Sequence, residues 1–311
     1  MLKSLIIGEP GRLPSVYSAY ERDQICELTD VVCDPVSREE VLKALSILRE
    51  VDVIFGTWGM PELGADFLDA APKLKAVFYA AGTVKSFATE EVFRRNIVMT
   101  SAYKANAVPV AEYCVATILF SLKLGWRHVR ALYLEKKWER ETANISGAYD
   151  ATVGLVSLGA IGKKTLELLR PYEVNCLVYS TSLTEEKAGE LGVKLGSLED
   201  IFAKSDVVSL HTPSLPTTQG MITPEHFRMM KENATFINTA RGAVVDQEGM
   251  IEALGVRNDI TAILDVTDPE PPEPGHSIFD LKNIFITPHI AGSLGSECRR
   301  LGQTAIDECK R

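Results

Sequence analysis

The sequence passes from a strand-like apolar run, through a turn with glycines, into a helical pattern at Val153-Gly154-Leu155-Val156-Ser157-Leu158-Gly159-Ala160-Ile161-Gly162. Strand-like runs recur after this stretch, with helical patterns between them. Because strands that alternate with helices form parallel sheets covered on both faces, the second half of the chain is expected to be a doubly wound α/β domain. The later runs are residues 175–179, 207–210, 234–237, 260–264 and 283–286.

The N-terminal part of the chain shows the same alternation. Strand-like runs cover residues 2–7, 51–55, 76–79 and 97–99, and helical patterns cover residues 38–48 and 90–95. A long apolar helix is expected over residues 109–123, with Pro109 in its first turn. The last helix, residues 295–310, is expected to return to the first domain. We therefore expect two α/β domains with a cleft between them, one formed by residues 1–102 and 291–311 and the other by residues 103–290.

The turn after Val156 resembles a dinucleotide-binding motif, which places Gly-x-Gly-x-x-Gly where a strand meets a helix. Gly159 allows the backbone to approach a pyrophosphate, and Gly162 allows the helix to pack closely on the strand. The amide groups at Ala160 and Ile161 favour a negative charge. Ser157 replaces the first glycine of this motif. The stretch does not match a P-loop either, because it lacks the first Gly of that motif and its Ser or Thr. The strands around the motif favour a Rossmann-like domain that binds a dinucleotide.

The residue that selects between NAD and NADP is not the usual one. An acidic residue is expected about 20 residues after the glycines, at the end of the second strand. This position holds Ser180, in Val178-Tyr179-Ser180-Thr181-Ser182. No Arg or Lys lies nearby for a 2′-phosphate, and Glu185-Glu186 would repel one. NAD is therefore favoured, with NADP as the alternative.

Arg241, Glu270 and His289 each follow one of the last three strand-like runs. Because the carboxyl ends of parallel strands share one crevice, we expect these residues to lie together. An imidazole exchanges protons near neutral pH, and a carboxylate beside it orients it and favours its charged form. A guanidinium grips a carboxylate by two parallel hydrogen bonds. Together, the three residues suit reduction of a 2-keto acid. Taken one at a time, His289 could be a structural histidine, Glu270 a solvated acid and Arg241 part of a surface salt bridge.

Two further residues at strand ends are candidates for contact with the cofactor. Asp265 suits either a hydrogen bond from a nicotinamide carboxamide or a cap on a turn. His211, in His211-Thr212-Pro213, is expected near the cofactor through its backbone.

Composition and charge exclude several classes of protein. The 311 residues are 46% hydrophobic and 24% charged, which argues against disorder and allows about two domains. The net charge is −9 and no basic run exceeds two residues, which argues against nucleic-acid binding. The six cysteines form no Cys-x-x-Cys pair, so no metal site is expected. No secretion signal or apolar run of ~18 residues is present, so we expect a cytoplasmic protein without a membrane span.

The chain resembles the D-isomer-specific 2-hydroxyacid dehydrogenases over most of its length, most strongly from about Asn106 to Gly292. The motifs that carry the resemblance are Asn106-Ala107-Val108-Pro109-Val110-Ala111-Glu112, Gly159-Ala160-Ile161-Gly162, residues 206–211, residues 238–242 with Asp246, residues 265–271 and residues 287–292. The resemblance implies hydride transfer between a nicotinamide cofactor and a 2-keto or D-2-hydroxy acid. Within the family, a 3-phosphoglycerate dehydrogenase and a glyoxylate/hydroxypyruvate reductase are the alternatives.

The resemblance also implies roles for single residues. His289 would be the acid/base, Glu270 its partner and Arg241 the anchor of the substrate carboxylate. The loop Ala80-Ala81-Gly82-Thr83-Val84, with Asn106 nearby, would cradle that carboxylate in the first, substrate-binding domain. The implied cofactor contacts are Gly159, Ala160, Ile161, Gly162, Ser180, His211, Thr212, Pro213, Thr239, Ala240 and Asp265. A homodimer is usual in the family, with the helix after Pro109 at the interface.

The chain departs from the family pattern in several places. Ser157 and Ser180 replace a glycine and an acid, and the cradle loop lacks the common Gly-x-Asp pattern after its first glycine. The substrate is therefore not implied. Family members usually continue beyond the position of Arg311. Because the family includes transcriptional corepressors, a non-catalytic nucleotide-sensing protein is the alternative from another class, although the presence of Arg241, Glu270 and His289 favours an enzyme.

Overall fold

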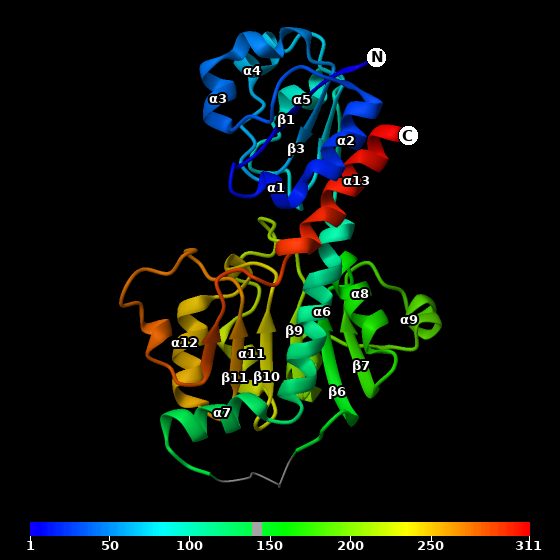
Figure 1. The fold of residues 1–311 in the computed structure, drawn as a ribbon. Coiled ribbons are helices and arrows are strands. Elements are labelled where there is room, and N and C mark those ends of the chain that lie inside the picture. Colours follow the sequence, from blue (N-terminus) through cyan, green and yellow to red (C-terminus); the bar gives the residue numbers. More distant parts are fainter. Residues whose placement is uncertain (139–144) are drawn as a thin grey trace. The chain divides into compact units, whose positions relative to one another are not determined.

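The computed structural model describes residues 1–138 and 145–311, which divide into two compact units (Figure 1). The first unit is Met1–Ala107 with Ser293–Arg311, and the second is Val108–Gly292. Each unit contains one parallel sheet with helices on both faces. The expected fold class, two parallel α/β domains, is confirmed.

The sheet of the first unit has the order β2-β1-β3-β4-β5. Its strands are β1 (Lys3–Ile7), β2 (Asp30–Val31), β3 (Val53–Gly56), β4 (Ala76–Tyr79) and β5 (Val98–Ser101). Leu5 and Ile7 of β1 face one core and Ile6 faces the other, as the alternation of side chains in a strand requires. The helices of the first core are α3 (Arg38–Lys43), α4 (Ala65–Ala70) and α5 (Glu90–Arg94), and those of the second are α1 (Leu13–Val16), α2 (Ala19–Leu28) and α13 (Cys298–Lys310).

The C-terminal helix α13 packs closely on the start of the chain. Its apolar residues Leu301 and Ile306 are fully buried in the core that α1 and α2 share with the sheet. A β-carbon at Gly302 would lie 2.1 Å from the backbone oxygen of Val16, so only glycine allows this approach. Arg299 of α13 also forms an ion pair with Glu21, which is 2% exposed, at 3.1 Å.

The sheet of the second unit has the order β12-β11-β10-β9-β6-β7-β8, with every pair parallel. The strands are β6 (Tyr149–Val156), β7 (Glu173–Tyr179), β8 (Lys194–Leu195), β9 (Val207–Leu210), β10 (Thr235–Asn238), β11 (Thr261–Leu264) and β12 (Ile284–Ile286). One face is covered by α6 (Tyr103–Ser121), α8 (Ala160–Leu169) and α9 (Glu185–Leu191), and the other by α10 (Leu198–Lys204), α11 (Pro224–Met229) and α12 (Gln247–Val256).

Several elements differ from the sequence-based expectation. Helix α6 begins at Tyr103, so Pro109 lies inside it rather than in its first turn. The turn before the proline is already helical, with the Asn106 N–H bonded to the Ala102 carbonyl at 3.0 Å. The helix expected over residues 38–48 is α3 followed by a 3₁₀ helix (Leu45–Glu50). The two-residue edge strands β2 and β8 were not expected, because they are too short to show a periodicity.

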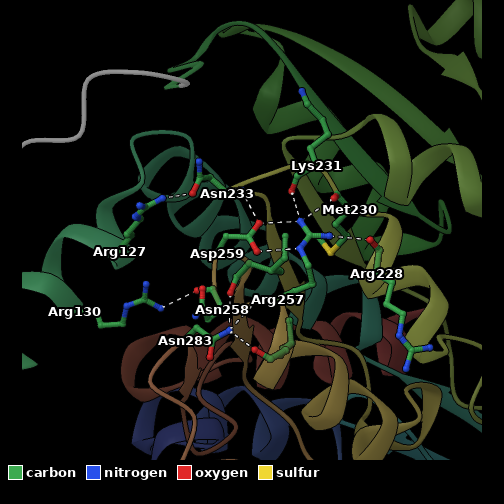
Figure 2. A network of polar contacts seen from close by, with 12 residues as sticks. Arg127, Arg130, Arg228, Met230, Lys231, Asn233, Arg257, Asn258, Asp259 and Asn283 are labelled. Carbon is green, nitrogen blue, oxygen red and sulfur yellow. Dashed lines mark hydrogen bonds and ion pairs between the residues drawn. The ribbon is translucent and has the colours of Figure 1, made fainter.

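The helix α7 (Gly125–Leu134) and the loops before β10, β11 and β12 are joined by a network of polar contacts (Figure 2). The Arg257 guanidinium donates to Asp259 at 2.8 and 2.9 Å and to the backbone oxygens of Arg228 and Met230. The Asn283 amide donates to the backbone oxygens of Leu254 and Ile260. Because these residues precede β10, β11 and β12, the network lies at the amino ends of these three strands, opposite their carboxyl ends.

Among the described helices, no single one is long and apolar enough to span a bilayer. Helices α6 and α7 reach that length and apolar composition only as a pair, and they are bent by 69° relative to each other.

Candidate active site

The candidate site lies at the carboxyl ends of the strands in the second unit. The chain runs outward from β6 to β7 and β8, and then from β9 to β12 on the other side, so β6 and β9 flank the point where the strand order reverses. Ligands of open α/β sheets bind at such a point. The expected residues follow the strands in turn: Gly159, Ala160, Ile161 and Gly162 after β6, Ser180 after β7, His211, Thr212 and Pro213 after β9, Thr239, Ala240 and Arg241 after β10, Asp265 and Glu270 after β11, and His289 after β12.

The structure brings His289 and Glu270 together. Nδ1 of His289 lies 2.5 Å from Oε1 of Glu270, although the residues are 19 apart in the sequence. Both side chains are partly open to solvent, at 46% and 40% exposure. The carboxylate occupies one ring nitrogen, which orients the imidazole and leaves Nε2 for another partner. This pair can hold a proton and present it at Nε2.

The loop that carries His289 is organised by Asp265, which is 2% exposed. The two carboxylate oxygens accept the N–H groups of Ile290 and Ala291 at 2.8 and 2.9 Å. The backbone oxygen of Asp265 accepts the N–H of His289 at 3.0 Å. His289 itself has φ +54°, a left-handed conformation that costs energy for a residue with a β-carbon. Asp265 thus serves as the cap of a turn, the second of its two expected roles, in addition to any contact with a cofactor.

The contacts of Thr287 and Tyr113 in this arrangement were not predicted from the sequence. The Thr287 hydroxyl donates to Asp265 Oδ1 at 2.6 Å and lies 3.0 Å from the Tyr113 hydroxyl of α6. Burial raises the pKa of Tyr113, so this phenol stays protonated and acts as a donor at neutral pH. No sequence pattern points to a contact across 174 residues.

Arg241 is exposed and lies at a turn shaped by Asn238. The Asn238 side chain accepts the N–H of Ala240 at 2.9 Å and donates to the Arg241 backbone oxygen at 3.1 Å. An Asn that bonds the backbone two residues on is a recognisable turn signal, so this role could have been read from Asn238-Thr239-Ala240. Within the described residues no carboxylate forms an ion pair with Arg241, whose guanidinium donates to the Ala240 backbone oxygen. The salt-bridge alternative therefore lacks support there.

The turn of Arg241 is packed against the segment that leads to Glu270. A β-carbon at Gly242 would lie 2.1 Å from the backbone oxygen of Thr267. Two further bonds join the segments, because the Gln247 side chain donates to the Asp268 oxygen at 2.7 Å and accepts the Asp268 N–H at 2.9 Å. The positions of the Arg241 and Glu270 backbones are thus coupled.

The dinucleotide turn leaves donors available for an anion. Gly159 is the N-cap of α8, makes no side-chain cap, and is followed by a first turn without acidic residues. Nothing lies within 4 Å of a β-carbon placed on Gly159, so a ligand can approach its backbone. A β-carbon on Gly162 would lie 2.4 Å from the Ser157 backbone oxygen, which explains the glycine there. The free amides and dipole of α8 suit the pyrophosphate of a dinucleotide.

His211 lies beside this turn and is 7% exposed. Burial lowers the pKa of His211 to about 4, so the ring is neutral at pH 7. Neither ring nitrogen has a hydrogen-bond partner among the described residues. Its backbone N–H is bonded to Val156 at 2.9 Å, and its Cδ2 lies 3.5 Å from a β-carbon placed on Gly162. Orphaned polar atoms next to open helix amides fit a site for a polar cofactor.

The remaining cofactor candidates have hydroxyl groups at strand ends. The Ser180 hydroxyl lies 3.3 Å from that of Ser182. The Thr239 hydroxyl is turned inward to Cys114 Sγ at 3.3 Å, and burial raises the pKa of Cys114 to about 11. That thiol is therefore unreactive at neutral pH.

In the cradle loop of the first unit, two backbone carbonyl groups accept hydrogen bonds from a side chain. Ser101 donates to the backbone oxygens of Ala81, at 3.0 Å, and Gly82. In the described part of the chain no acceptor takes the N–H groups of Ala81, Gly82 and Thr83. The Asn106 side-chain oxygen accepts the Ser293 N–H at 3.0 Å, and its Nδ2 lies 3.8 Å from a β-carbon placed on Gly82. The loop thus offers several donors to a carboxylate.

Within residues 1–138 and 145–311, no group of three or more His, Cys, Asp and Glu side chains is placed to hold a metal ion.

Comparisons with known proteins identify the family of the chain. Residues 117–291 match the family model described as D-isomer specific 2-hydroxyacid dehydrogenase, NAD binding domain. The chain is 31% identical over 83% of its length to a D-3-phosphoglycerate dehydrogenase from Archaeoglobus fulgidus, of which 48% is covered. It is 30% identical over 96% of its length to a glyoxylate reductase from Thermofilum pendens, of which 87% is covered.

The fold of the whole chain is also found among solved structures. The NAD-complexed D-isomer specific 2-hydroxyacid dehydrogenase from Lactobacillus delbrueckii ssp. bulgaricus has a TM-score of 0.80 at 20% identity, covering 99% of this chain and 96% of that one. The chain spans about half the length of the curated phosphoglycerate dehydrogenases it matches. The family match confirms NAD as the cofactor expected from the sequence.

Proposed function

Because the chain belongs to the D-isomer-specific 2-hydroxyacid dehydrogenases, we propose that it interconverts a 2-keto acid and a D-2-hydroxy acid with NAD. The observation that carries the proposal is the 2.5 Å contact between His289 Nδ1 and Glu270 Oε1 at the carboxyl edge of the NAD-binding sheet. The bound nicotinamide supplies the hydride for reduction and accepts it in oxidation.

His289 is the proton donor in this scheme. A keto group that gains a hydride at carbon also gains a proton at oxygen, and Nε2 of His289 delivers it. Glu270 holds the ring by Nδ1 and stabilises the charge of the imidazolium before transfer. In the oxidative direction the same nitrogen accepts the proton from the hydroxyl group.

Arg241 is the proposed anchor of the substrate carboxylate. Its exposed guanidinium, without a carboxylate partner in the described chain, can form two parallel hydrogen bonds. The N–H groups of Ala81, Gly82 and Thr83, with Nδ2 of Asn106, supply further donors. Two parallel hydrogen bonds from the guanidinium would orient the substrate and its adjacent carbonyl for reaction.

The cofactor is assigned to the turn after β6 and the strand ends beside it. The amides of residues 160–162 would hold the pyrophosphate, and His211, Thr212 and Pro213 form the neighbouring loop. Thr239, Ala240 and Asp265 lie at the next two strand ends. Ser180 would meet the adenosine ribose, and its lack of charge keeps NADP as an alternative cofactor.

A homodimer is part of the proposal. Helices α6 and α7 expose large apolar side chains, including Phe120 at 41%, Tyr133 at 66% and Leu134 at 57%. Exposed apolar side chains on neighbouring helices favour burial against a second copy. Light scattering after gel filtration should give twice the mass of the chain, and a monomer at micromolar concentration would contradict this part.

Substrate and cofactor can be tested together by following oxidation of NADH and of NADPH. The keto acids should include glyoxylate, hydroxypyruvate and phosphohydroxypyruvate, as the names of the relatives suggest, with pyruvate, phenylpyruvate and 2-ketoglutarate. We expect turnover with at least one acid, and His289→Ala should lower kcat by about 10²–10⁴ while NADH binding persists. Equal turnover in the variant would refute the role of His289. Tight nucleotide binding without turnover of any acid would favour the nucleotide-sensing alternative.

A further inference from the structure

Ser157 adopts a backbone conformation that favours glycine. Its φ of +77° lies in the left-handed region, where a β-carbon is crowded. The residue is also fixed by its backbone, because its N–H donates to the Tyr179 oxygen at 2.7 Å and its own oxygen lies against Gly162. A serine at this position therefore lowers the stability of the fold relative to a glycine. Any advantage of the serine must come from the contacts of its side chain.

The Ser157 side chain reaches the loop after the neighbouring strand. Its Oγ lies 2.9 Å from Oγ1 of Thr212, a residue 3% exposed and 55 positions further along the chain. Thr212 Oγ1 also lies 3.5 Å from the Val156 backbone oxygen. Thr212 follows His211, whose orphaned ring nitrogens border the same turn. The hydroxyl pair thus joins the β6 turn to the β9 loop at the point where the strand order reverses.

We propose that Ser157 is a positioning residue for the dinucleotide, because its hydroxyl bond to Thr212 sets the spacing between the β6 turn and the β9 loop. The inference rests on the proposed placement of NAD at this turn. A glycine at position 157 would relax the backbone but could not make the bond. Ser157→Gly should therefore weaken the binding of the cofactor without a matching loss of stability in the ligand-free protein. A purely structural role of the serine does not predict this difference.

Four variants separate the two contributions. Ser157→Ala keeps the left-handed conformation and loses the hydroxyl, whereas Ser157→Gly relieves the conformation and loses the hydroxyl. Thr212→Val removes the partner with little change of shape, and Thr212→Ser keeps a hydroxyl there. The dissociation constant of NADH, measured by calorimetry without substrate, and the melting temperature without ligand are the readouts.

We expect Ser157→Ala, Ser157→Gly and Thr212→Val each to weaken NADH binding by roughly three- to tenfold, as loss of one hydrogen bond implies. Thr212→Ser should bind about as the parent does. The double variant Ser157→Ala/Thr212→Val should bind no more weakly than the weaker single variant, because both remove the same bond. Ser157→Gly should melt at least as high as Ser157→Ala.

Two results would overturn the inference. NADH affinity of Ser157→Gly equal to that of the parent would show that the hydroxyl does not position the cofactor. Simple addition of the two single effects in the double variant would show that Ser157 and Thr212 act independently. If the folded parent itself failed to bind NADH, the proposed cofactor site would fail and this inference with it. If the parent bound NADH and turned over normally, and the variants had the same NADH dissociation constant as the parent, only the positioning role of Ser157 would be refuted.

Discussion

The backbone N–H of His289 donates to the backbone oxygen of Asp265 at 3.0 Å. The Asp265 carboxylate accepts the N–H groups of Ile290 and Ala291, the two residues after His289. The proposed proton donor is therefore held by a buried acid that directly follows the neighbouring strand β11. This relationship places the imidazole where Glu270 meets it, and it makes the loop sensitive to changes at a residue that need not touch the substrate.

Asp265→Asn should weaken both the fold and the reaction. The side chain of the variant would present an NH₂ group to one of the two backbone N–H groups that now donate to the carboxylate. That buried N–H would then lack a hydrogen-bond acceptor. We expect a loss of about 1–3 kcal/mol in the free energy of unfolding and at least a tenfold lower kcat. Urea unfolding and steady-state kinetics measure these effects. The exposed Asp280 provides the control, and equal behaviour of Asp265→Asn and Asp280→Asn would contradict the role of Asp265.

Glu270→Gln tests the partner of the proposed acid. The amide is uncharged, so it stabilises an imidazolium less than the carboxylate does. We expect kcat for keto-acid reduction to fall by about one to two orders of magnitude, with the NADH dissociation constant unchanged. Glu273→Gln, in the same exposed segment, should behave as the parent does. A loss of NADH affinity that matched the loss of turnover would indicate a structural effect instead.

His211 should make the protein sensitive to mild acid. Its folded pKa of about 4 lies below the ordinary histidine value of 6.5, so the unfolded chain binds more protons between these limits. Stability therefore falls as the pH decreases from 6.5 to about 4, by an upper bound of about 3 kcal/mol from this group. His211→Leu should show a shallower decline in the free energy of unfolding from pH 7 to pH 5. The same slope in parent and variant would show that the ring is not buried in its neutral form.

Gly302→Ala tests the packing of the C-terminal helix on α1. The added methyl group would lie 2.1 Å from the Val16 oxygen, so α13 must shift. We expect a loss of about 1–3 kcal/mol in stability, measured by urea unfolding. Gly189→Ala in α9, where nothing lies within 4 Å of the new carbon, should instead be neutral or stabilising by up to about 1 kcal/mol. A harmless alanine at residue 302 would mean that α13 lies further from α1 than the structure shows.

Much of the site was predictable because its residues sit at strand ends. The periodic runs before Arg241, Glu270 and His289 are local, and parallel strands bring their carboxyl ends to one edge, so the pairing of His289 with Glu270 could be anticipated. The start of α6 was misjudged, because a proline within a helix and one in its first turn look alike in sequence.

Local patterns in the sequence predicted the α/β class and the dinucleotide turn, and they pointed to the candidate acid/base, its carboxylate partner and the candidate anchor. Those features depend on periodicity and on residue types that follow a strand. The contacts of Thr287 with Tyr113, of Asp265 with residues 290 and 291, and of Ser157 with Thr212 were decided by the tertiary structure. The residues of each contact are 25 or more positions apart along the chain, so only packing of the sheet and its helices brings their polar atoms within hydrogen-bond distance.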